Sequence, residues 1–126
     1  MILIKSNESA ENYLETILVL SKRLPVVRSI DIAVEMGFKK SSISVAMKNL
    51  REHGHIAVSD AGFITLTESG REIAEMIYER HTFLSNWLTN LGVEEKTASE
   101  DACRMEHFIS RESFEAIKNY VNEKGM

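Results

Sequence analysis

Three side chains in the last third of the chain have the spacing of metal ligands. Cys103, Glu106 and His107 lie at positions i, i+3 and i+4, and in a helix this spacing places them on one face, about one turn apart. They supply a thiolate, a carboxylate and an imidazole, a mixed donor set that suits a divalent transition metal. Buried single cysteines and exposed Glu–His pairs are also common without metal, so the triplet alone leaves both interpretations open.

A histidine interrupts the apolar row of the preceding helix. Residues 67–91 are expected to form one long helix, and His81 stands in its inward row where leucine or isoleucine would be expected. A core histidine bonded to a carbonyl is the alternative, but the triplet on the next helix favours a shared metal site. Asn12 and Glu15 form a further polar pair at i, i+3 in the first helix, and a solvated face would by itself explain them.

The elements that must position these residues are mainly helices. Helical spacing and capping residues predict six of them, at about 8–23, 29–36, 41–53, 67–91 and 94–109, with a sixth that begins after Ser110. Two short β-rich runs around the turn at Gly62, residues 56–58 and 63–66, predict a small β-hairpin. The fold class is therefore mainly α with one hairpin.

Individual residues predict where these helices begin, end and bury side chains. Gly37 closes the second helix, and Thr67 caps the fourth. Ser41 or Ser42 caps the third helix, which buries Ile43, Met47 and Leu50. In the second helix we expect three residues to face inward, namely Ile30, Ala33 and Val34.

The order of helix, short helix, glycine turn, helix and hairpin predicts a winged helix-turn-helix that binds DNA. The net charge is −4, yet residues 22–53 hold seven basic and three acidic side chains, which gives this segment +4 and leaves −8 for the rest. Basic side chains attract phosphates, small hydroxyls reach bases or phosphates, and a valine can touch a thymine methyl. The DNA-binding candidates are Arg28, Lys39, Lys40, Ser41, Ser42, Ser44, Val45, Lys48 and Arg51. A three-helix bundle without nucleic acid is the alternative.

The composition of this 126-residue chain indicates the cellular compartment in which we expect it. One cysteine cannot form an internal disulfide, so we expect the reducing cytoplasm. No stretch approaches the roughly 20 apolar residues of a membrane span, and the apolar start ends at Ile4, unlike a signal peptide.

Several motifs in order resemble the diphtheria toxin repressor and manganese transport regulator family. They are Glu11–Ile17, Asp31-Ile32-Ala33, the Leu66-Thr67-x-x-Gly70 step, Arg80-His81 and, most specifically, Asp101–Ser110. The resemblance covers about residues 8–122. It implies an N-terminal winged helix-turn-helix domain, residues 1–70, and a C-terminal helical metal-binding and dimerisation domain, residues 71–126.

The resemblance also implies the function, a homodimer that binds double-stranded operator DNA and represses metal-uptake genes when Mn²⁺ or Fe²⁺ is abundant. By motif match the metal ligands are Asn12, Glu15, His81, Cys103, Glu106 and His107. Ligands from the first helix and from the C-terminal helices would tie the two domains together. No membrane and no organic substrate is expected, and the protein is expected not to be an enzyme.

The sequence departs from the family pattern at four places. Asn12 stands where the iron branch has methionine and the manganese branch aspartate, and Ser85 and Ser99 replace the ligands of an accessory site, so we expect that site to be absent or altered. Because the sequence ends at residue 126, we expect the further C-terminal domain of longer members to be missing. Cys103 favours Fe²⁺, because thiolates prefer softer ions, whereas Glu15 and His81 match ligands of the manganese branch, a resemblance that favours Mn²⁺.

Two other functions stay open at this point. A winged-helix regulator that ignores metal would bind neither Mn²⁺ nor Fe²⁺ tightly. A small metalloenzyme would use the same ligands for hydrolysis, but it would leave the basic helix-turn-helix without a role.

Overall fold

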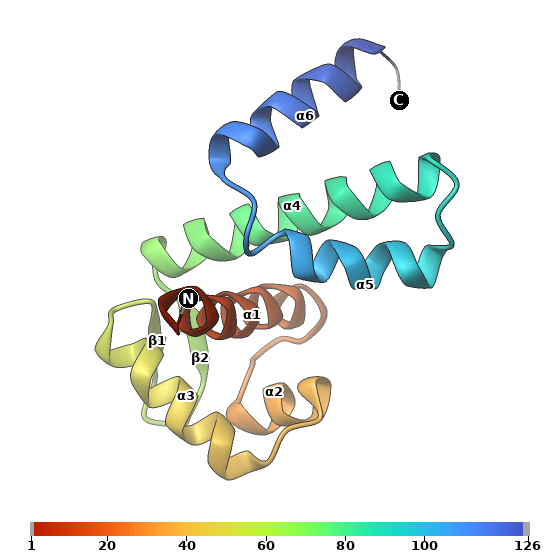
Figure 1. The fold of residues 1–126 in the computed structure, drawn as a ribbon. Coiled ribbons are helices and arrows are strands. Elements are labelled where there is room, and N and C mark those ends of the chain that lie inside the picture. Colours follow the sequence, from red (N-terminus) through yellow and green to blue (C-terminus); the bar gives the residue numbers. More distant parts are fainter. Residues whose placement is uncertain (1, 125–126) are drawn as a thin grey trace. The chain divides into compact units, whose positions relative to one another are not determined.

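The computed structural model describes residues 2–124, with side chains from residue 8 onward. The described part of the chain has the predicted class, mainly α with one hairpin (Figure 1). Its elements are α1 (Ile2–Arg23), α2 (Ser29–Met36), α3 (Lys40–Glu52), β1 (Ile56–Val58), β2 (Ile64–Leu66), α4 (Glu68–Asn90), α5 (Glu95–Met105) and α6 (Arg111–Lys124). None of the described helices is both long and apolar enough to cross a membrane.

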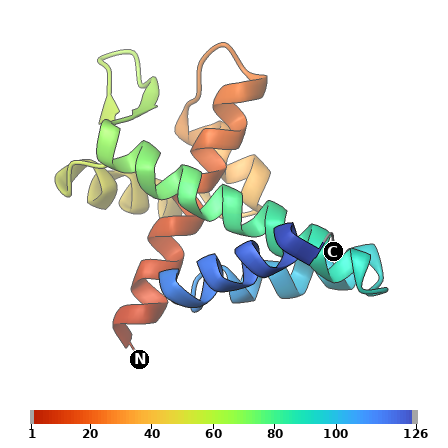
Figure 2. The ribbon, with the colours of Figure 1, turned by 90° about the horizontal axis from the view of Figure 1, so that it is seen from above.

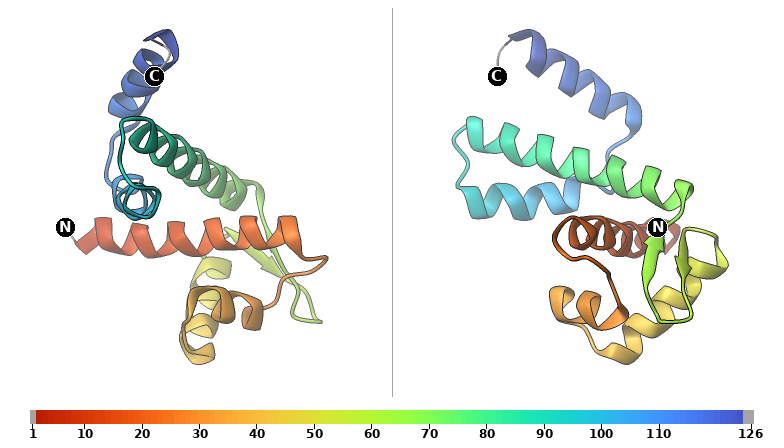
Figure 3. Two further views of the ribbon diagram at one scale, coloured as in Figure 1. Left: turned by 90° about the vertical axis from the view of Figure 1, so that its right-hand side faces the viewer. Right: turned by 180° about the vertical axis from the view of Figure 1, so that it is seen from behind.

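The chain forms two compact units, Met1–Glu75 and Met76–Met126, and α4 begins in the first and ends in the second. The predicted domain boundary at residue 70 stays a prediction. In the first unit α1 lies against α2, α3 and β2 (Figure 3). Its core contains Leu14, Ile17 and Ile32 together with the predicted inward row of α3, namely Ile43, Met47 and Leu50.

The first unit has the helix order and the wing of a winged helix-turn-helix. Gly37 ends α2 in the left-handed conformation, and its N–H donates to the Ala33 carbonyl, as predicted. β1 and β2 pair antiparallel with Ile56 opposite Leu66, and Figure 2 shows the loop between them projecting from the start of α4. Behind this wing, the Ile64 N–H donates to the Val27 carbonyl at 2.7 Å, which fixes β2 to the segment before α2.

Three local predictions for this unit were wrong. The first helix begins at Ile2, well before residue 8. Ser41 and Ser42 lie inside the first turn of α3, because Lys39 is the extended residue before the helix and its carbonyl accepts the first helical bond, from the Ile43 N–H. In α2 the buried residues are Ile32 and Ala33, whereas Ile30 and Val34 are 48% and 75% exposed.

The Leu66-Thr67-x-x-Gly70 step joins the wing to α4 through backbone contacts. The Thr67 hydroxyl donates to the Gly54 carbonyl at 2.7 Å and accepts from the Gly70 N–H at 3.3 Å, which confirms Thr67 as a helix cap. Gly70 lies so close to the His55 carbonyl oxygen that a Cβ atom would overlap it. The motif therefore needs a hydroxyl at its second position and no side chain at its fifth.

In the second unit α4 and α5 run side by side in opposite directions (Figures 1 and 3). Leu84, Ala102 and Phe114 from α4, α5 and α6 form its buried cluster. The Ser110 hydroxyl accepts from the Ser113 N–H at 3.0 Å, so the predicted cap of α6 is confirmed. The fifth helix ends at Met105 instead of residue 109, and Glu106 is its C-cap residue with helical backbone angles.

We expect Gly70→Ala to destabilise the protein. Alanine is the better helix former by about 1 kcal/mol, but its Cβ would meet the backbone of His55, which cannot rotate away. We expect the free energy of unfolding to fall by about 2–3 kcal/mol, the upper part of the range for overpacking. Urea denaturation measures it.

The control for this measurement is Glu72→Ala, an exposed position two residues further along α4, which should change stability by less than about 0.5 kcal/mol. A Gly70→Ala protein as stable as wild type would contradict the close approach of α4 to His55.

Candidate metal centre and nucleic-acid interface

In the second unit α4, α5 and the C-cap of α5 bring His81, Cys103 and Glu106 together. Their donor atoms all lie within 4.8 Å of one another, and in the described part of the chain they are the group of His, Cys, Asp and Glu residues that meets this spacing. His81 Nδ1 lies 3.1 Å from Glu106 Oε2 and 3.7 Å from Cys103 Sγ. The imidazole thus faces both of the other donors through one nitrogen.

Burial of Glu106 makes this cluster a favourable place for positive charge. Its side chain is 0% exposed, and Oε1 has no hydrogen-bond partner among the described residues. An ionised carboxylate in such a place is costly unless a cation or hydrogen-bond donors compensate it. A divalent ion would do so, and the imidazole, thiolate and carboxylate set suits a transition metal of intermediate softness. The residues present therefore fit a metal.

His81 holds a proton where such an ion would be ligated. The pKa of His81 is raised from 6.5 to about 10, mainly by the hydrogen bond to Cys103 and, second in size, by the hydrogen bond to Glu106. Burial lowers the pKa by a smaller amount. The metal-free protein therefore carries an imidazolium here at neutral pH. A ligand imidazole must be neutral, so metal and proton compete for Nδ1.

The other predicted metal ligands are placed differently. The side chain of His107 is 1% exposed, and its Nε2 lies 3.5 Å from Glu106 Oε1, on the connection after α5. Asn12 and Glu15 lie half-buried on α1, in the first unit. The predicted metal-binding role of all six residues stays a prediction.

Arg80 has a structural role that the sequence did not predict, although the residue belongs to the Arg80-His81 motif. Arg80 and Glu106 are the charged residues buried within the described part of the chain. Arg80 Nη1 donates to the Glu106 carbonyl at 3.1 Å and to the Ile109 carbonyl at 2.8 Å. The one feature of the sequence that pointed to Arg80 was its position directly before His81, a candidate metal ligand.

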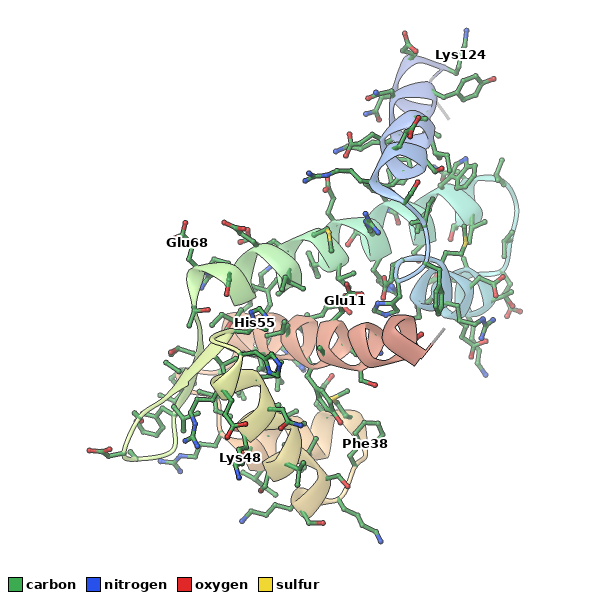
Figure 4. All side chains as sticks on the ribbon, turned by 60° about the vertical axis from the view of Figure 1, so that its left-hand side comes forward. Glu11, Phe38, Lys48, His55, Glu68 and Lys124 are labelled. Atoms are coloured by element: carbon green, nitrogen blue, oxygen red, sulfur yellow. The ribbon has the colours of Figure 1, made fainter. Side chains whose placement is uncertain are left out.

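The DNA-binding candidates lie on the outer surface of the first unit. Because α3 buries Ile43, Met47 and Leu50, helical geometry turns the intervening positions outward. All nine candidate residues are exposed, and Val45 is 62% exposed. Figure 4 shows Lys48 projecting from α3 into solvent. The Arg28 guanidinium lies over the Phe63 ring of the wing, 4.7 Å from its centre. Their role in DNA binding stays a prediction.

Comparison with known families assigns both halves of the chain. Residues 5–62 match the profile "Iron dependent repressor, N-terminal DNA binding domain". Residues 67–124 match "Iron dependent repressor, metal binding and dimerisation domain".

Similar proteins agree with these matches. The chain is 34% identical to an uncharacterised HTH-type transcriptional regulator of Methanocaldococcus jannaschii, over 93% of this chain and 95% of that one. It is 30% identical to the transcriptional regulator MntR of Escherichia coli, over 94% of this chain and 76% of MntR.

Solved structures resemble it as well. They include the manganese regulator SloR (TM-score 0.80, 25% identity) and a manganese-dependent transcriptional repressor in complex with manganese (TM-score 0.81, 28% identity). Each match covers 90% of this chain, which spans 53% and 52% of those two chains.

We expect metal binding to release the His81 proton. At pH 7.5, below the pKa of about 10, wild-type protein should release about one proton more than His81→Gln, and its affinity for Mn²⁺ should rise with pH. Calorimetry in two buffers of different ionisation enthalpy measures the release. Equal proton release by both proteins would contradict the presence of this proton on His81.

The same proton should affect the stability of the metal-free protein. The pKa in the folded state lies above 6.5, so the stabilisation is fully present below pH 6.5 and is lost as pH rises through about 10. Thermal unfolding of wild type and His81→Gln should therefore differ most at pH 6 and least above pH 10. A difference that grows with pH would contradict the direction of the shift.

Proposed function

Since the chain belongs to the iron-dependent repressor family, the diphtheria toxin repressor and manganese transport regulator family that its motifs resemble, we propose that it represses metal-uptake genes when Mn²⁺ or Fe²⁺ occupies a site built on His81, Cys103 and Glu106. The observation that supports this site most strongly is the fully buried Glu106 carboxylate, which lies next to two other donors.

The family assignment confirms the recognition made from the motifs. The chain is a metal-responsive, DNA-binding transcriptional repressor with a DNA-binding domain and a metal-binding and dimerisation domain. We propose further that it acts as a homodimer on double-stranded operator DNA, in the cytoplasm, and that it is not an enzyme. DNA binding and metal binding together give each half of the chain a role, which the metalloenzyme alternative does not.

His81, Cys103 and Glu106 would respond to metal as a group. A bound divalent ion supplies positive charge and holds its ligands in one arrangement. His81 would give up its proton, Cys103 would act as a thiolate, and Glu106 would keep its buried carboxylate paired. Such binding shifts the protein toward whichever conformation holds these three side chains best. In that conformation the two recognition helices of a dimer would fit major-groove half-sites about one helical turn, or a multiple of it, apart.

The exposed face of α3 would read the operator. Ser41, Ser42 and Ser44 lie near its N-terminus, where backbone N–H groups also favour a phosphate. Val45 is positioned to touch a thymine methyl group. The basic candidates Arg28, Lys39, Lys40, Lys48 and Arg51 would contact phosphates, which strengthens binding to any sequence and makes it sensitive to salt.

The choice between Mn²⁺ and Fe²⁺ depends on Cys103. A thiolate prefers the softer Fe²⁺, while carboxylate ligands suit Mn²⁺. The similar regulator MntR and the similar manganese-dependent repressor are named for manganese. Both ions are therefore proposed.

We expect Glu106→Gln to abolish metal-dependent DNA binding. Glutamine keeps the shape of the side chain but removes its charge, so Mn²⁺ affinity should fall at least about 100-fold, the upper end for loss of a supporting residue. The operator is first selected from a random duplex pool in the presence of Mn²⁺. Fluorescence anisotropy then compares binding of that duplex with Mn²⁺ and with a chelator.

Glu100→Gln is the matched control, because Glu100 is an exposed carboxylate on α5, six residues before Glu106. It should bind metal and DNA as wild type does. A Glu106→Gln protein that keeps tight, Mn²⁺-stimulated DNA binding would overturn the proposed site. Binding that is equally tight with a chelator, in wild type, would favour a metal-independent regulator.

We expect Cys103→Asp to change metal preference toward Mn²⁺. The substitution exchanges a soft sulfur donor for a hard oxygen. The ratio of the Fe²⁺ to the Mn²⁺ dissociation constant should therefore increase relative to wild type. Anaerobic calorimetry with each ion measures both constants, and an unchanged ratio would show that the sulfur does not ligate the ion.

A further inference from the structure

Arg80 is a buried cation whose hydrogen-bond partners are backbone carbonyls. Its side chain is 7% exposed, and an arginine is almost never so buried without compensation. Its Nη1 atom donates to two backbone carbonyls, those of Glu106 and Ile109. The guanidinium carbon lies 5.4 Å from the centre of the Phe114 ring, and Nε has no hydrogen-bond partner among the described residues. Such burial is costly, so the contacts that it makes must matter to the fold or to the site.

The two carbonyls belong to the connection between α5 and α6. Glu106 is the C-cap residue of α5, and carbonyls at the end of a helix lack partners within it and carry the negative end of the helix dipole. Ile109 comes two residues before α6 begins. One guanidinium nitrogen therefore holds both ends of the turn that carries Glu106 and His107.

Glu106 is consequently held twice from α4. His81 contacts the carboxylate at 3.1 Å, and the adjacent Arg80 contacts the carbonyl of the same residue at 3.1 Å. The side chain and the backbone of Glu106 are thus fixed relative to one short segment of α4. On the other side of the turn, Phe114 of α6 lies against the same guanidinium.

We propose that Arg80 is a positioning residue for the metal centre, which aims the Glu106 carboxylate and couples metal occupancy to the placement of α6. The inference rests on the proposed function, because it concerns the same site. Arg80 ties the turn that carries Glu106 to α4. When Glu106 ligates a metal, the turn and the start of α6 would therefore become ordered together. Lysine is a poor substitute, because it is a point charge without the planar group that packs on Phe114.

The test compares Arg80→Met and Arg80→Lys with wild type, with Co²⁺ as a spectroscopic probe and Mn²⁺ for affinity. We expect Arg80→Met to bind Mn²⁺ about 10- to 100-fold more weakly, as for residues that orient metal ligands, and to alter the Co²⁺ absorption bands. Arg80→Lys should fall between Arg80→Met and wild type. Hydrogen exchange in residues 106–124 should slow on Mn²⁺ binding in wild type and much less in Arg80→Met.

Glu75→Gln is the control, since Glu75 is an exposed residue of α4 whose ion pair, with Arg71, lies within the same helix. It should leave the Mn²⁺ affinity and the Co²⁺ spectrum unchanged. If Arg80→Met fails to fold, the comparison of Arg80→Lys with wild type tests the inference.

Wild-type affinity, spectrum and hydrogen exchange in the folded Arg80 variant would overturn the inference. In that case wild-type metal binding would still stand, so the proposed function would survive. A wild-type protein that binds neither ion would overturn both.

Discussion

The second unit depends on the placement of one buried carboxylate. Glu106 is fully enclosed, with one oxygen bonded to His81 and the other without a hydrogen-bond partner among the described residues. A buried charge of this kind destabilises a fold unless positive charge compensates it. The protonated imidazole supplies part of that compensation, and a divalent ion would supply more. The same residue is thus the weak point of the metal-free protein and the centre of its proposed switch.

Much of the fold follows from patterns that are local in sequence. The inward row of α3, the glycine that ends α2 and the hydroxyl caps of α4 and α6 all lie where spacing and residue type predict them. The errors occur where tertiary contacts decide. Ile30 and Val34 have the spacing of a buried face but are exposed, because Ile32 enters the core instead. The end of α5 at Met105 was also not predicted. The carbonyl of the following residue, Glu106, accepts a hydrogen bond from Arg80, which lies 26 positions earlier in the chain.

The candidate metal centre was predictable only in part. The spacing of Cys103 and Glu106 on one helix, and a histidine in an apolar row, were sufficient to predict that these residues meet. The burial of the carboxylate and the contacts of Arg80 could not be predicted, because they depend on how closely α4 and the turn after α5 approach each other. A charged residue next to a candidate ligand is a weak signal in sequence, and it becomes informative only when its burial is known.

The most direct test of the metal centre is X-ray absorption spectroscopy of the protein loaded anaerobically with Fe²⁺. Ligation by Cys103, His81 and Glu106 predicts one sulfur neighbour, at about the 2.3 Å that thiolates adopt on zinc, together with nitrogen and oxygen neighbours. Cys103→Ser should lose the sulfur signal. Stoichiometric binding with only nitrogen and oxygen neighbours, unchanged by Cys103→Ser, would place the ion elsewhere and contradict the account.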